Sequence, residues 1–271
     1  MKYIVFTDID GTLIEHDTYS YEAAKPALSA LKEQDIPLIF CTSKTRAEIE
    51  VYVKELDLAY PFISENGGAI FIPHNYFDVE YAHTKETPEY DIIELGTDYG
   101  TLRKNLADIR RSVDFEIIGF GDMDDVGVSE DTGLDIESAR LAKIREYDEA
   151  FRLGKGANTP DAEKRLTELI KSHGLNHTRG GRYWHIIGDN DKGKAVTILS
   201  EIYRRQFDDI RTIGLGDSQN DLPMLQAVDI PLLVRKPGGQ YDASIKDARI
   251  NKVKGIGPVG WNIAILDILM A

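Results

Sequence analysis

An apolar run near the N-terminus ends in two aspartates that stand one residue apart. Residues 3–8 suit a buried strand, and Asp10, Gly11 and Thr12 follow directly after Asp8 and Ile9. Like charges at this spacing repel each other and lose hydration when buried, so the pair is unsuited to an ordinary core. A divalent cation would remove that repulsion, whereas an Asp- and Gly-rich turn is the plainer alternative. The sequence therefore predicts a strand that carries two carboxylates to its open end, one to bind a metal and attack, the other to transfer protons.

Buried apolar strands alternate with amphipathic helices in two parts of the chain. The first alternation fills residues 3–57, and the second resumes at Lys192 and runs to the C-terminal helix. Continuous apolar strands between such helices indicate a parallel sheet with helices on both faces. The sequence thus predicts an α/β fold with a doubly wound core. The expected strands are 3–8, 36–41, 212–215 and 230–234, and the expected helices include 22–34 and 45–57.

Residues 83–189 differ in character from the segments on either side. Charged helices such as 161–173 occur there, and segments such as 182–187 alternate in the manner of antiparallel strands. A segment of this kind inside a doubly wound sheet indicates an inserted α+β domain joined by two linkers. We therefore expect a core made of residues 1–82 and 190–271, with the inserted domain over 83–189.

Composition and charge narrow the classes of partner. The chain has 46 acidic and 32 basic residues and a net charge of −14, which argues against binding to a nucleic-acid backbone. Cys41 is the only cysteine, so no intramolecular disulfide can form, and this fits a reducing compartment. The N-terminus does not resemble a signal peptide, and no apolar run approaches the roughly 20 residues that span a bilayer. We expect a cytoplasmic monomer or small homo-oligomer that binds neither nucleic acid nor membrane.

Polar residues follow the second predicted strand, at the edge of the sheet where parallel sheets bind ligands. Thr42, Ser43 and Lys44 come directly after this strand and precede a helix. A hydroxyl and the free N–H groups of a first helical turn together form an anion site, although a simple helix cap is an equally ordinary explanation. Lys192 opens the helix that follows the insertion, where its ammonium would offset an anionic cluster and hold a phosphoryl oxygen.

Two further aspartates follow the strand predicted at 212–215. Asp217 and Asp221 stand four residues apart at a junction between a strand and a helix, and Asn220 lies between them. This spacing suits one metal site, with Asp217 as a direct ligand and Asp221 at the metal or just behind it. Hard oxygen ligands without nearby Cys or His select Mg²⁺ over zinc.

A glycine pair inside the insertion is flanked by two arginines. Arg179 and Arg182 enclose Gly180 and Gly181. Glycines allow a ligand to approach the backbone N–H groups closely, and arginine pairs carboxylates through two hydrogen bonds. The segment is therefore a candidate site for a substrate carboxylate. A hairpin turn with exposed arginines remains the alternative.

Taken in order, these residues resemble the signature motifs of haloacid dehalogenase-superfamily phosphatases. The late insertion, after residues 64–69, is similar to the large C2-type caps of the sugar-phosphatase branch of that superfamily. Five further segments resemble mannosyl-3-phosphoglycerate phosphatases, and the similarity extends over essentially the whole chain. One departure is Ala150, where that branch would have proline. The five segments are 42–46, 65–68, 145–149, 179–182 and 257–262.

The resemblance implies a Rossmann-like core and a Mg²⁺-dependent hydrolysis of a phosphate monoester. In that reaction Asp8 attacks phosphorus, and Asp10 protonates the leaving alkoxide and then activates water. Thr42 and Lys192 hold the phosphoryl group, while the cap selects the leaving group. The implied metal site consists of Asp8, Asp10, Asp217 and Asp221, and the implied substrate ligands are Ser43, Lys44, Arg179, Gly180, Gly181, Arg182 and Asn220.

The substrate implied by the resemblance is mannosyl-3-phosphoglycerate, whose hydrolysis gives the compatible solute mannosylglycerate. The glucosyl analogue is a close alternative, because sugars that differ at one hydroxyl can share a pocket. A phosphomutase or phosphotransferase would use the same aspartyl-phosphate but pass it to another hydroxyl. A sugar-phosphate sensor on an inactive fold is a further alternative. The intact pair Asp8 and Asp10 argues against it, since only catalysis needs the second carboxylate.

Overall fold

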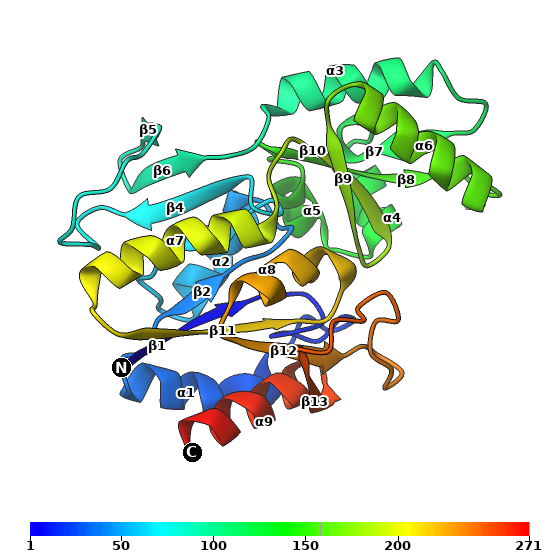
Figure 1. The fold of residues 1–271 in the computed structure, drawn as a ribbon. Helices are drawn as coiled ribbons and strands as arrows, with labels where there is room; N and C mark the ends of the chain where they lie inside the picture. The colour runs from blue at the N-terminus through cyan, green and yellow to red at the C-terminus, as the bar shows by residue number, and fades with distance from the viewer. Residues whose placement is uncertain (158, 271) are drawn as a thin grey trace.

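A five-stranded parallel sheet forms the centre of the core in the computed structural model, which describes residues 1–157 and 159–270 (Figure 1). The strand order is β13-β12-β11-β1-β2, and each strand is parallel to its neighbours. Side chains alternate between the two faces, as a sheet covered on both sides requires. The strands are β1 (Lys2–Thr7), β2 (Leu38–Phe40), β11 (Ile210–Gly216), β12 (Ile230–Arg235) and β13 (Asn251–Ile256).

Helices cover both faces of this sheet, which confirms the doubly wound prediction. Val5 and Ile213 pack with α1, α2 and α9 on one face, whereas Ile4 and Phe6 pack with α7 and α8 on the other. Figure 1 shows α1 and α9 below the sheet and α7 and α8 above it. The helices are α1 (Lys25–Glu33), α2 (Arg46–Glu55), α7 (Lys192–Gln206), α8 (Leu222–Ala227) and α9 (Gly257–Leu269).

A second, antiparallel sheet extends the core and was not predicted. Its order is β3-β4-β6-β5, and a bridge between Cys41 and Ile63 joins it to β2. Because β6 pairs with both β4 and β5, residues 85–94 extend the same sheet as residues 62–73. We therefore propose an insertion that runs from 97 to 189. The strands are β3 (Phe62–Ser64), β4 (Ala69–Pro73), β5 (Lys85–Glu86) and β6 (Tyr90–Glu94).

The inserted unit has the predicted α+β architecture. A four-stranded antiparallel sheet, in the order β7-β8-β10-β9, packs against α3 and α6 on one face and against α4 and α5 on the other. No described helix is long and apolar enough to cross a membrane. The elements are α3 (Tyr99–Arg110), β7 (Ile117–Gly119), α4 (Asp125–Thr132), α5 (Ile136–Ala142), β8 (Asp148–Leu153), α6 (Pro160–Ser172), β9 (Asn176–Gly180) and β10 (Tyr183–Ile187).

Candidate active site

Three buried carboxylates meet where β1 and β11 end side by side. Asp8, Asp217 and Asp221 are 6%, 5% and 0% exposed, and one oxygen of each lies within 4.8 Å of the others. Lys192, the first residue of α7, donates from Nζ to Asp8 Oδ1 at 2.7 Å and to Asp221 Oδ1 at 2.6 Å. The site therefore combines three acids with one buried ammonium.

Burial sets the electrostatics of this cluster. Burial raises the pKa of Asp8 well above its usual value, and Asp221 and Asp217 add to the rise, whereas Lys192 opposes it. Burial, followed by the charge of Asp221, raises the pKa of Asp217 to about 6. Burial opposes the charge of Lys192, but Asp221 and Asp8 hold its pKa above the usual value. One cation for three carboxylates leaves an excess of negative charge that a further cation would balance.

Local backbone geometry brings these acids together. Asp221 Oδ2 accepts hydrogen bonds from the backbone N–H groups of Asp217 and Ser218, both at 2.9 Å, which fixes the strand-to-helix junction. Gly11 has a φ of +74°, and a Cβ there would lie 3.0 Å from Asp217 Oδ2. Only glycine combines this conformation with so close an approach.

Asp10 lies apart from the cluster and faces Lys44 instead. Its Oδ2 lies 3.1 Å from Lys44 Nζ, and Lys44 also contacts Glu48 Oε1 at 3.3 Å. The other oxygen of Asp10 is buried and has no hydrogen-bond partner among the described residues. The Asp10 carboxylate is thus not among the three that meet, and its place in the metal site stays a prediction. The turn after Ile9 directs it toward α2, where it faces an ammonium.

A cavity of about 550 Å³ lies above the acids, between the core and the inserted domain. Asp8, Asp10 and Asp217 line its core wall, whereas Thr42, Lys192 and Asp221 lie buried behind that wall. The predicted substrate ligands Ser43, Lys44, Gly180, Gly181, Arg182 and Asn220 also line it. The inserted domain adds apolar side chains to the other wall, namely Phe120, Leu134, Ala142, Ala150 and Tyr183.

Thr42 and Ser43, which follow β2, do not cap the helix α2. Thr45 is the N-cap of α2, and it forms a reciprocal capping box with Glu48. Thr42 is fully buried, and its hydroxyl oxygen accepts a hydrogen bond from the Lys44 N–H at 3.3 Å. Thr42 and Ser43 are therefore free of the capping role.

The two predicted arginines have different environments. Arg182 lines the cavity and donates to the Thr132 carbonyl at 2.5 Å. Arg179 lies outside the cavity, where it pairs with Glu163 at 3.1 Å and stacks over the Trp184 ring. Arg179 pairs with Trp184 across the hairpin, on the face that packs against α6. The role predicted for Arg179 in substrate binding stays a prediction.

Sequence reasoning missed a buried network in the cavity wall. Asp148 is fully buried and contacts Arg145, His185 and Asn66 at 3.0, 2.8 and 2.7 Å. Asn66 in turn accepts from Asn220 Nδ2 at 3.0 Å, which links the inserted domain to the loop after β11. The segment 145–149 carried a family resemblance, but nothing local to it indicated these partners.

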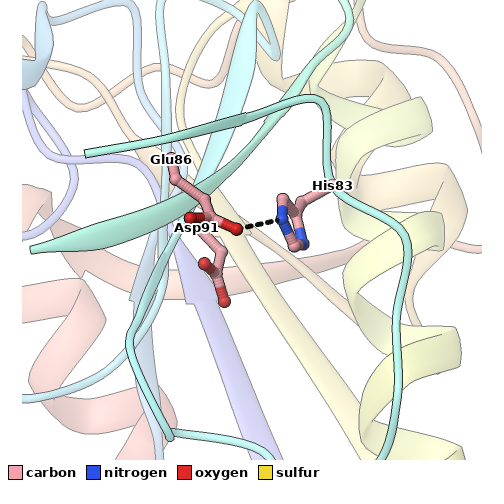
Figure 2. Close-up of side chains that lie close together, drawn as sticks. All are labelled: His83, Glu86 and Asp91. Carbon is pink, nitrogen blue, oxygen red and sulfur yellow. Dashed lines mark hydrogen bonds and ion pairs between the residues drawn. The ribbon is translucent and has the colours of Figure 1, made fainter. Parts of the chain in front are cut away.

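A second group of metal-ligand types, outside the cavity, is exposed and already paired. Figure 2 shows His83 just before β5, Glu86 on β5 and Asp91 on β6. His83 Nε2 lies 2.9 Å from Glu86 Oε1, and Asp91 contacts the Tyr81 hydroxyl at 2.6 Å. His83 and Glu86 are exposed, so water and salt screen their charges. No metal is needed here to offset charge repulsion, in contrast to the buried site at Asp8.

The chain is similar in sequence to curated phosphatases and in fold to a solved sugar phosphatase. A curated glucosyl-3-phosphoglycerate/mannosyl-3-phosphoglycerate phosphatase of Methanococcoides burtonii is 64% identical over 269 residues, covering 99% of this chain and 98% of that protein. The mannosyl-3-phosphoglycerate phosphatase of Pyrococcus furiosus is 36% identical, and the match covers 90% of this chain and 97% of that protein. A solved subclass IIB sugar phosphatase matches all of both chains with a TM-score of 0.66 at 18% identity. A family model for haloacid dehalogenase-like hydrolases matches residues 5–236, and the chain therefore belongs to that family.

Proposed function

We propose that this protein is a Mg²⁺-dependent phosphatase of glycosyl-3-phosphoglycerates, with the mannosyl and glucosyl compounds as its substrates. The observation that carries the proposal is the pair Asp8 and Asp10 at the floor of a cavity whose opposite wall belongs to the inserted domain. The names of the two curated relatives supply the substrate class. A phosphate monoester fits the floor, and a sugar fits the partly apolar upper wall.

The carboxylates of Asp8, Asp217 and Asp221 would hold Mg²⁺. They supply hard oxygen ligands, and their excess negative charge suits a small divalent cation. When bound, the metal would neutralise charge on the phosphoryl oxygens and on the attacking carboxylate.

The protein's own residues would carry out two displacements at phosphorus. Asp8 attacks, a bond forms between its carboxylate oxygen and phosphorus, and the bond to the sugar-acid oxygen breaks. Asp10 gives its proton to that leaving alkoxide, then removes a proton from the water that hydrolyses the aspartyl-phosphate. Lys44 forms an ion pair with Asp10 Oδ2 and so holds this carboxylate at the cavity wall. Lys192 keeps Asp8 oriented toward the cavity.

The inserted domain would close over the site and select the leaving group. It contacts the core through Asn66 and Asp148, so the cavity walls are held together on one side. Arg182 and the backbone at Gly180 and Gly181 are positioned to contact the sugar. Enclosure excludes bulk water and strengthens the electrostatic interactions with the phosphoryl group.

A phosphate-release screen tests this proposal. The panel contains mannosyl- and glucosyl-3-phosphoglycerate, 3-phosphoglycerate and simple sugar phosphates, each with Mg²⁺, and Asp8→Asn is the inactive control. We expect the two glycosyl-3-phosphoglycerates to have the highest kcat/KM. Formation of a sugar bisphosphate in place of free phosphate would identify a mutase. Binding without turnover would identify a sensor.

A further inference from the structure

One arginine of the inserted domain is buried against the cavity and keeps one unused hydrogen-bond donor. The Arg145 side chain is 5% exposed and lines the cavity. Its Nη1 donates to Asp148 Oδ1 at 3.0 Å, and its Nε has no partner among the described residues. A buried guanidinium with a free N–H is costly unless a ligand completes its hydrogen bonds.

Asp148 fixes the orientation of this guanidinium. Although burial raises its pKa, the charges of His185 and Arg145 and the hydrogen bonds of His185 and Asn66 bring the pKa below the usual value, so the carboxylate is ionised. It is shared between His185 Nδ1 and Arg145 Nη1, both in contact with Oδ1. Arg145 is therefore held in place by an anion while its side chain lines the cavity.

The other cations of the cavity wall are less suited to a substrate carboxylate. Lys44 contacts Asp10 and Glu48, and Lys236 contacts Asp242 at 2.7 Å. Arg182 is exposed and donates to a backbone carbonyl. Exposed charges are screened by water, whereas a buried arginine binds an anion more strongly.

The position of Arg145 suits a carboxylate close to the phosphorus. In a 3-phosphoglycerate, the carboxylate carbon is separated from the phosphate oxygen by only two carbons. Arg145 Nη1 also reaches the backbone carbonyl of Ser43 at 3.5 Å, and the neighbouring residue Lys44 contacts Asp10. The guanidinium thus borders the part of the core wall where the leaving oxygen would lie.

We propose that Arg145 binds the carboxylate of the glycerate unit, and that Asp148 is the residue that positions it. This assignment rests on the proposed function and differs from the one predicted for Arg179 and Arg182. It makes the inserted domain select a charged leaving group by an ion pair close to the reacting phosphorus, while Arg182 is left to contact the sugar.

The test compares two substrates that differ only at the carboxylate. They are glucosyl-3-phosphoglycerate and its analogue in which a hydroxymethyl group replaces the carboxylate. Arg145→Gln and Arg145→Lys are assayed on both, with Arg165→Gln as the control, since Arg165 is an exposed arginine of the inserted domain that lies outside the cavity. We expect Arg145→Gln to lower kcat/KM for the carboxylate substrate ~10- to 100-fold, the range for a lost charge-assisted hydrogen bond, and to leave the analogue within a few-fold. Arg165→Gln should change neither.

A second measurement uses the unmodified protein and does not depend on a variant that folds. D-glycerate and glycerol are compared as inhibitors of p-nitrophenyl phosphate hydrolysis. We expect glycerate to inhibit more strongly than glycerol. Equal inhibition by both compounds, or equal losses on both glycosyl substrates, would overturn the assignment to Arg145. If the parent protein releases no phosphate from any glycosyl-3-phosphoglycerate but hydrolyses other esters, the proposed function fails instead.

Discussion

Replacing Glu65 by glutamine is expected to change how the free energy of unfolding depends on pH. Glu65 is fully buried between the two domains, where its carboxylate accepts the backbone N–H groups of Glu146, at 3.0 Å, and Tyr147, at 2.8 Å. Burial raises its pKa to about 8, against the lowering effect of Arg145 and of these two hydrogen bonds. The folded protein thus retains a proton that a solvated glutamate would lose.

The sign and the size of the effect follow from that difference in proton binding. In the unfolded chain a glutamate ionises near pH 4.3, so between about pH 5 and about pH 8 only the folded state holds the proton. Stability therefore falls as pH rises through this window. Ionisation of Glu65 alone raises the unfolding equilibrium constant by up to about tenfold per pH unit. Between about pH 5 and about pH 8 this lowers the free energy of unfolding by roughly 3–4 kcal/mol in total. Glutamine resembles the protonated acid but cannot ionise, so Glu65→Gln should remove this contribution.

The assay is urea unfolding followed by far-ultraviolet circular dichroism, with chelator present throughout. At about pH 5 we expect Glu65→Gln to lie within about 1 kcal/mol of the parent, because the amide keeps one carbonyl acceptor. At about pH 8 the variant should be the more stable protein. Glu201→Gln, on the exposed surface of α7, should retain the parent's pH dependence. Parallel pH profiles for the parent and Glu65→Gln would refute the reasoning.

Three further predictions concern the acid cluster. Asp10→Asn should slow hydrolysis of the natural substrate by ~10²-fold or more but still form the aspartyl-phosphate from p-nitrophenyl phosphate; an unchanged rate on the natural substrate would disprove its role as the acid. Chelation should abolish phosphate release and Mg²⁺ should restore it, so turnover by protein shown to be metal-free would contradict the metal site. Lys192→Met should lower the free energy of unfolding by about 3–5 kcal/mol in chelator, because it leaves Asp8 and Asp221 buried without their cation; a change below about 1 kcal/mol, measured in urea, would contradict this ion-pair network.

The alternation of the core and the edge where ligands would bind were predictable from sequence. Strand and helix periods are local properties, so β1, β2, β11 and β12 could each be predicted from a few neighbouring residues. Parallel strands place their carboxyl ends at one edge, and this general rule predicted that Asp8 and Asp217 would meet. The antiparallel strands β4 and β6 were missed, because their sequence pattern does not tell which sheet they join.

Only the tertiary structure decided which polar side chains face the cavity and which are paired away from it. Asp10 pairs with Lys44, and Arg179 pairs with Glu163. The turns that orient these side chains have no hydrophobic period from which their direction could be predicted. Arg145 and Asp148 acquired their significance from contacts with the cavity and with Asn66, 82 positions away from Asp148. A hydrophobic period repeats along a single helix or strand, so it can be recognised in the sequence of that segment alone. A hydrogen bond or ion pair depends on the orientation of two distant segments, which is fixed only when the whole chain packs.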